Sequence, residues 1–133
     1  MKIESYSRIW KIVYLIYPPL LRILEKLGFH KGRQKYPIGF LDQTKYSPES
    51  FRNYLTSIGF EPAILAWKDS DEVLSMRKVD QHKFQWHIRL YSDGEIRGHY
   101  EYSSEGNPIG HVTEAVFLNE QEHFTDLLKD YLV

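Results

Sequence analysis

Two histidines, two arginines and two glutamates recur at every second position between residues 85 and 101. These side chains occupy odd-numbered positions of the segment from Phe84 to Tyr102, which reads FQWHIRLYSDGEIRGHYEY. We call this set of side chains the polar face: Gln85, His87, Arg89, Tyr91, Glu95, Arg97, His99 and Glu101. Imidazole and carboxyl groups can transfer protons, and guanidinium groups bind phosphate, so the polar face concentrates the residues most suited to chemistry.

The opposite parity of the same segment is apolar, which is typical of antiparallel strands that bury one side. We therefore predict strands at 84–91 and 95–102. Ser92, Asp93 and Gly94 favour a three-residue turn with Gly94 at positive φ. In that register His87 faces His99 and Arg89 faces Arg97, with Cβ atoms ~5 Å apart. The polar face should then be open to solvent, unless the N-terminal helices or a partner subunit cover it.

Phosphodiester chemistry without a metal is the first interpretation of the polar face. His87, His99 and Glu101 would act as acid and base. Further residues would bind an anionic ligand, either a phosphate-bearing small molecule or a short RNA: Arg89, Arg97, Tyr91 and Arg77. Two arginines that face each other favour an anion between them. The constellation resembles that of small microbial ribonucleases of the barnase and T1 type, which would imply cleavage without a cofactor, although none of their motifs is present.

Two other interpretations of the polar face stay open. His87, His99 and Glu101 could instead hold Zn²⁺ or Fe²⁺, with His111 or His82 as a further ligand. The charges of Arg89 and Arg97 oppose a cation there. Alternatively, the face has no chemistry, and the chain is an interaction domain that dimerises through its N-terminal helices. Mixed charges on a solvated sheet need no function at all.

The remaining elements that must position this face follow from periodicity and capping signals. We expect helices at 9–17, 19–27, 48–58 and 120–132, the last with Asn119 and Glu122 as its capping pair. Strands are expected at 63–67, in the centre of the sheet, at 73–79 and at 111–118. On the strand at 73–79, Leu74 and Met76 should point inward and Arg77 to the opposite face. Residues 28–46 look like a basic loop. The predicted fold class is α+β, with an antiparallel sheet of four to five strands.

Length and composition limit the organisation of the chain. Its 133 residues suit a single domain, with residues 1–27 as an apolar, aromatic arm packed on the core or on a partner. The chain has no cysteine, which fits a cytoplasmic location. Residues 1–47 carry nine basic and three acidic side chains, whereas residues 48–133 carry eight and fifteen. We expect no transmembrane span, because Lys11, the proline pair at 18–19 and Arg22 interrupt an apolar run that is far short of about 20 residues. Peripheral membrane contact through 9–27 and homodimer formation remain alternatives.

Overall fold

The computed structural model describes residues 15–16, 19–20, 23, 27, 36–64, 69–113 and 115–133. The elements in chain order are β1 (Pro37–Phe40), α2 (Pro48–Ser57), β2 (Glu61–Pro62), β3 (Glu72–Asp80), β4 (Phe84–Tyr91), β5 (Glu95–Tyr102), α3 (Pro108–Thr113), β6 (Phe117–Leu118) and α4 (Gln121–Leu128). The predicted α+β class is confirmed. The helices predicted at 9–17 and 19–27 lie almost entirely outside the described residues. Among the helices that are described, none is long and apolar enough to cross a bilayer.

The sheet is antiparallel and has the strand order β1-β5-β4-β3-β2, with β6 also paired to β5. The long hairpin β4–β5 has the predicted bounds and the predicted register. His87 lies opposite His99, and Arg89 lies opposite Arg97. Gly94 adopts a φ of 91° in the turn, as the three-residue loop requires. The even-numbered and odd-numbered side chains of this hairpin therefore lie on opposite faces of the sheet.

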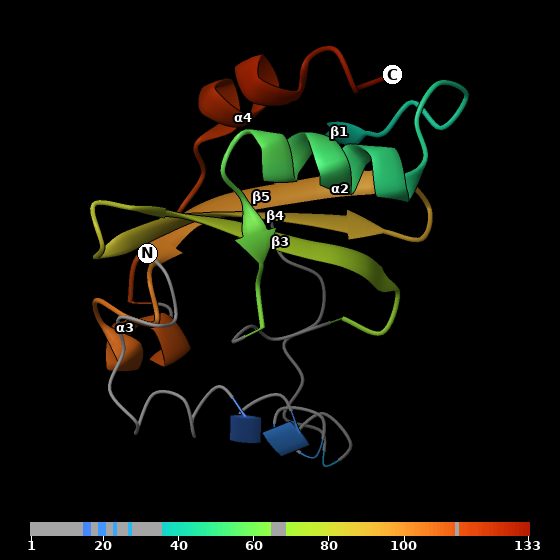
Figure 1. Cartoon of the computed structure of the whole chain (residues 1–133). Coiled ribbons are helices and arrows are strands. Elements are labelled where there is room, and N and C mark those ends of the chain that lie inside the picture. The colour runs from blue at the N-terminus through green and yellow to red at the C-terminus, as the bar shows by residue number, and fades with distance from the viewer. Residues whose placement is uncertain are drawn as a thin grey trace.

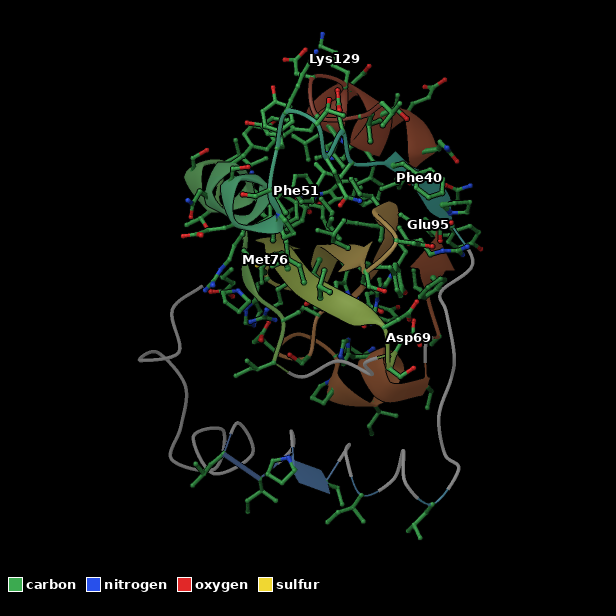
Figure 2. All side chains as sticks on the ribbon, turned by 90° about the vertical axis from the view of Figure 1, so that its right-hand side faces the viewer. Phe40, Phe51, Asp69, Met76, Glu95 and Lys129 are labelled. Atoms are coloured by element: carbon green, nitrogen blue, oxygen red, sulfur yellow. The ribbon has the colours of Figure 1, made fainter. Side chains whose placement is uncertain are left out.

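The apolar core lies between one face of the sheet and the helices α2 and α4, which both cover that face (Figure 1). Met76, Ile88, Leu90 and Ile96 come from the sheet, and Phe51, Leu55, Phe124 and Leu128 come from the two helices. Figure 2 shows Phe51 in the helical layer and Met76 on β3 beneath it. Each of these large side chains contributes about 1.5–3 kcal/mol by leaving water. The short helix α3 lies on the other side of the sheet, with the polar face (Figure 1).

The helix predicted at 48–58 is confirmed as α2. The Ser47 hydroxyl accepts a hydrogen bond from the Ser50 backbone N–H at 3.1 Å, and Pro48 occupies the first turn. Gly59, at a φ of 100°, follows the helix and turns the chain toward β2. The capping signals in the sequence were therefore sufficient to place this helix.

Two strand predictions were wrong in position. No strand occupies Ala63 and Ile64, and residues 65–68 lie outside the described part. The pairing in this region involves Glu61 and Pro62 at the edge of the sheet rather than at its centre. Residues 111–113 belong to α3, and only Phe117 and Leu118 of the predicted strand 111–118 pair with β5. Helix α3 begins there because the Asn107 side chain accepts a hydrogen bond from the Gly110 N–H at 2.9 Å and Pro108 starts the first turn.

The ends of the described fold also differ from the prediction. Helix α4 ends at Leu128 rather than 132, and its N-cap is Glu120 without a side-chain hydrogen bond, so the predicted Asn119–Glu122 capping pair is wrong. The chain after α4 instead pairs with residues 40–42: Asp42 N–H donates to Tyr131 O, and Val133 N–H donates to Phe40 O. Strand β1 lies within the segment that was predicted to be a loop.

Gly98 offers a test of packing between the sheet and its helical cover. A Cβ atom at this position would lie 2.7 Å from Ile38 Cδ1 and 3.1 Å from the Phe124 ring. We expect Gly98→Ala to lower the free energy of unfolding by about 1–3 kcal/mol, measured in urea, because the core must shift to admit a methyl group. Gly39→Ala is the matched control on the neighbouring strand, since its Cβ would meet Leu132 at an ordinary 3.4 Å. Equal losses in both variants would contradict this account.

Candidate functional site

The centre of the polar face is buried rather than open to solvent, and the exception allowed in the prediction, cover by the N-terminal helices, falls on residues outside the described part. His87 is 0% exposed, His99 1% and Glu101 3%. Part of the cover comes from the segment after β5. The Phe117 ring stacks on His99 with centroids 4.0 Å apart, and His111 of α3 brings its Nδ1 within 3.7 Å of Glu101 Oε1. Burial of this many polar groups is costly unless each finds a partner.

Strands β4 and β5 bring His87, His99 and Glu101 together, as the register predicted. His87 Nδ1 lies 3.4 Å from Glu101 Oε1, and His99 Nε2 lies 3.0 Å from Glu101 Oε2. One potential ligand atom from each of the three residues lies within 4.8 Å of the other two. The Gln85 side chain donates to Glu101 Oε1 at 2.8 Å and so fixes the orientation of this carboxylate.

The surroundings determine the charges of these groups. Burial, and then the charge of Arg89, hold the pKa of His87 well below its usual value, so that its imidazole is neutral at pH 7. Burial by itself raises the pKa of Glu101, but the neighbouring His99 and His87 outweigh it, and the net pKa is well below the usual value. The site therefore presents a carboxylate beside a neutral imidazole, the protonation states in which these groups bind metals.

The His99 ring is buried without complete hydrogen bonding. Among the described residues, neither Nδ1 nor Nε2 of His99 makes an aligned hydrogen bond, although Nε2 is close to Glu101. A buried polar atom without a partner costs about 1–3 kcal/mol, so such an atom calls for an explanation. A ligand bound between His99 and Glu101 would provide one.

The arginines of this face each have carboxylate partners. Arg89 Nη1 lies 2.9 Å from Glu72 Oε2, and Arg97 pairs with Glu95 next to it on β5. Arg77 Nη1 lies 2.6 Å from Glu105 Oε1, and its Nη2 lies 2.9 Å from Glu61 Oε1. These carboxylates reduce the repulsion between the facing Arg89 and Arg97 that led us to expect an anion between them.

The other residues predicted to take part are placed as follows. The Tyr91 hydroxyl donates to Asp69 Oδ2 at 2.6 Å, and burial, followed by this hydrogen bond, raises the pKa of Tyr91. The Nδ1 of His111 donates to Tyr102 O at 2.9 Å, so His111 borders the cluster without belonging to its three-residue core. His82 is exposed in the turn between β3 and β4 and lies outside the cluster.

Ser75 of β3 is a residue of this site that sequence reasoning missed. Its Oγ lies 2.7 Å from His87 Nε2. The placement depends on the register between β3 and β4, which is set by a turn in which Gln81 and His82 adopt positive φ values of 50° and 65°. Residues other than glycine rarely adopt this conformation, so the sequence carried no signal for the turn or for the register.

No protein-family model matches this chain, and comparison with curated proteins and with solved structures found no significantly similar protein. Function must therefore be argued from the site itself.

Proposed function

We propose that this domain binds a divalent first-row transition-metal ion, Zn²⁺ or Fe²⁺, through His87, His99 and Glu101. The observation that carries the proposal is the buried cluster of two imidazoles and one carboxylate, in which neither ring nitrogen of His99 makes an aligned hydrogen bond to any residue in the described part of the chain. Two histidines with one carboxylate are a ligand set that both Zn²⁺ and Fe²⁺ accept.

Two separations within the cluster fall in the range of adjacent metal ligands. With bonds of about 2.0–2.2 Å, adjacent ligands of a tetrahedral or octahedral ion lie roughly 2.9–3.5 Å apart. His87 Nδ1 lies 3.4 Å from Glu101 Oε1 and His99 Nε2 lies 3.0 Å from Glu101 Oε2, so each imidazole faces its own oxygen of the carboxylate. Gln85 holds the carboxylate from outside, as second-shell partners commonly do. Three protein ligands leave a coordination position for water or a substrate, which is the arrangement of catalytic zinc sites.

An anionic, phosphate-bearing ligand stays a prediction with less support. Arg77, Arg89 and Arg97 each have a carboxylate partner, and an incoming phosphate would have to compete with it. Dimerisation or membrane contact through residues 9–27 stays a prediction as well, since most of that segment lies outside the described residues.

A second candidate function is nucleophilic catalysis by Ser75. Its Oγ lies 2.7 Å from His87 Nε2, and the Nδ1 of the same ring lies 3.4 Å from Glu101 Oε1. A serine, a histidine and a carboxylate connected in this order form an acyl-transfer triad in several unrelated folds. Metal binding takes precedence because the triad leaves the His99 ring nitrogens without a role.

Metal affinity tests the main proposal. We expect metal-free protein to bind Zn²⁺ and Fe²⁺ in a competition titration against a coloured chelator, with little binding of Mg²⁺, which prefers oxygen ligands. His99→Ala and Glu101→Gln should each lower the affinity at least about 100-fold, because each removes or weakens a ligand. His123→Ala is a control, since His123 lies on Trp86 on the helical side of the sheet. Wild-type protein that binds no transition metal would refute the proposal.

His111 should matter less than the three ligands. Its Nδ1–H donates to Tyr102 O and lies 3.7 Å from Glu101 Oε1, so His111 borders the carboxylate without being one of the three proposed ligands. We expect His111→Gln to lower zinc affinity by about 10-fold, at the lower end of second-shell effects. The same titration measures it. A loss as large as that of His99→Ala would instead identify His111 as a fourth ligand.

A further inference from the structure

We propose that the segment 16–27 binds peripherally to the surface of an anionic phospholipid membrane. The contact would be made by four apolar side chains, which we call the apolar row: Ile16, Leu20, Ile23 and Leu27. This proposal is independent of the metal site and concerns a different part of the chain. It rests on the exposure of the four side chains, on their spacing and on the charges that accompany them.

The apolar row is exposed to solvent in the described structure. The exposed fractions of its side chains are 55%, 44%, 54% and 68% in chain order. Single exposed apolar residues are common, but several together on a protein surface usually mark an interaction site. Figure 1 and Figure 2 both show the described residues of this segment, drawn in blue, apart from the sheet and its covering helices. Burial in the described part of the fold therefore does not account for the apolar row.

The spacing of the apolar row is that of one side of a helix. Its members follow one another at intervals of four, three and four positions, and the first three have a helical backbone. The Leu27 N–H donates to Ile23 O at 3.1 Å, which continues the helical hydrogen-bonding pattern. The basic residues Arg22 and Lys26 occupy sequence positions out of phase with the row. An apolar stripe with basic residues out of phase is typical of helices that lie in the plane of a membrane surface.

The charge distribution of the chain favours an anionic surface as the partner. Residues 1–35 carry eight basic and two acidic side chains, whereas residues 48–133 carry eight basic and fifteen acidic ones. An anionic leaflet attracts the first part and repels the second, so the segment that carries the apolar row should be the point of contact. Aromatic residues precede and adjoin the row at Trp10, Tyr14 and Tyr17. Tryptophan and tyrosine concentrate at the boundary between lipid and water.

A second copy of this chain is the other occupant that the apolar row could accept, and the sequence disfavours it. Coiled-coil pairing is indicated by a heptad pattern that continues over about three to four heptads. The apolar row spans fewer than two, and Pro18 and Pro19 lie within it. Proline lacks a backbone N–H and interrupts a continuous helix. Insertion into a lipid interface needs no matching helix of this length, so the membrane is the better partner.

Co-sedimentation of the full chain with phospholipid vesicles, in EDTA, tests the proposal. We expect binding to vesicles of phosphatidylcholine with phosphatidylserine, and binding at least about 10-fold weaker to phosphatidylcholine alone. Leu20→Ser combined with Ile23→Ser should weaken binding to the anionic vesicles at least about 10-fold, because it removes apolar area from the contact. Ile109→Ser is the matched control, since Ile109 is 78% exposed on α3 outside this segment, and it should bind as the wild type does.

The contrary outcomes are equally definite, and none of them bears on the metal site. Wild-type protein that stays in solution with anionic vesicles would refute the proposal. Equal binding of the wild type and of the double serine variant would also overturn it, because the contact would then lie elsewhere. A lipid-free dimer in analytical ultracentrifugation that the double serine variant converts to a monomer would assign the apolar row to a second copy of the chain instead.

Discussion

Zinc is expected to raise the thermal unfolding midpoint of the metal-free protein by about 10 °C. A ligand that binds only the folded state at 100 times its dissociation constant stabilises that state by about 2.7 kcal/mol. For a domain of this size, 1 kcal/mol corresponds to roughly 3–5 °C. The ligands come from β4 and β5, the two central partners of the sheet, so they are assembled only in the folded protein. Circular dichroism melts with zinc and with EDTA measure the difference.

The controls distinguish a specific site from general effects of the ion. In His99→Ala and Glu101→Gln the shift with zinc should be under about 2 °C, whatever the stability of each variant without metal. His82→Asn should keep the full shift, since His82 is exposed and lies outside the cluster. Asparagine also tolerates the positive φ of 65° at this position. A zinc shift that survives in His99→Ala would place the binding elsewhere.

The arrangement of the three proposed ligands could be predicted from parity together with the turn. A one-residue slip between β4 and β5 would have moved the apolar side chains Ile88, Leu90 and Ile96 to the wrong face, so parity excludes such a slip. The three-residue Ser92–Gly94 turn then selects one register among those that keep the faces. Strand pairing and the neighbourhood of His87, His99 and Glu101 therefore followed from local sequence, because they depend on contacts between nearby residues.

The burial of the polar face could not be predicted in the same way. Alternating polar residues in a strand usually indicate contact with water, because buried charges need partners. The partners in this protein come from distant positions: Glu72 lies on β3, Glu105 follows β5, and Phe117 belongs to β6. Nothing in the local pattern of β4 and β5 indicates that these residues are present.

The elements that were misplaced share a physical cause. Strand β1, which begins at Pro37, and the two-residue strands β2 and β6 are too short to show alternation, and they exist because a neighbouring strand offers free hydrogen-bonding groups. Helix α3 starts at Asn107 and Pro108, a pair that is equally suited to a break in the chain. Tertiary pairing rather than local preference determines such segments, so periodicity fails there first.

Arg77→Met is expected to lower the free energy of unfolding by about 3–5 kcal/mol. The Arg77 side chain is 6% exposed, and among the described residues its guanidinium group contacts Glu105, Glu61, Gln85 and Ser104. Methionine keeps the apolar stem but removes the charge, and loss of one member of a buried ion pair is costly because the other remains in a poorly hydrated environment. The side chain of Glu105 is only 1% exposed, so its carboxylate should bear most of this cost. Urea unfolding monitored by tryptophan fluorescence measures the change.

Two further variants connect this loss to the buried pair rather than to the general removal of charge. Lys45→Met removes a cation that is 70% exposed and 3.9 Å from Asp42, and it should change stability by less than about 0.5 kcal/mol. Arg77→Met combined with Glu105→Gln should be more stable than Arg77→Met alone, because the second change removes the buried carboxylate that faced the lost guanidinium group. If the double variant were less stable by the sum of the two single losses, Arg77 and Glu105 would not be coupled.

Because Arg77 also donates to Gln85, which holds Glu101, the stability of this pair and the geometry of the proposed metal site should change together.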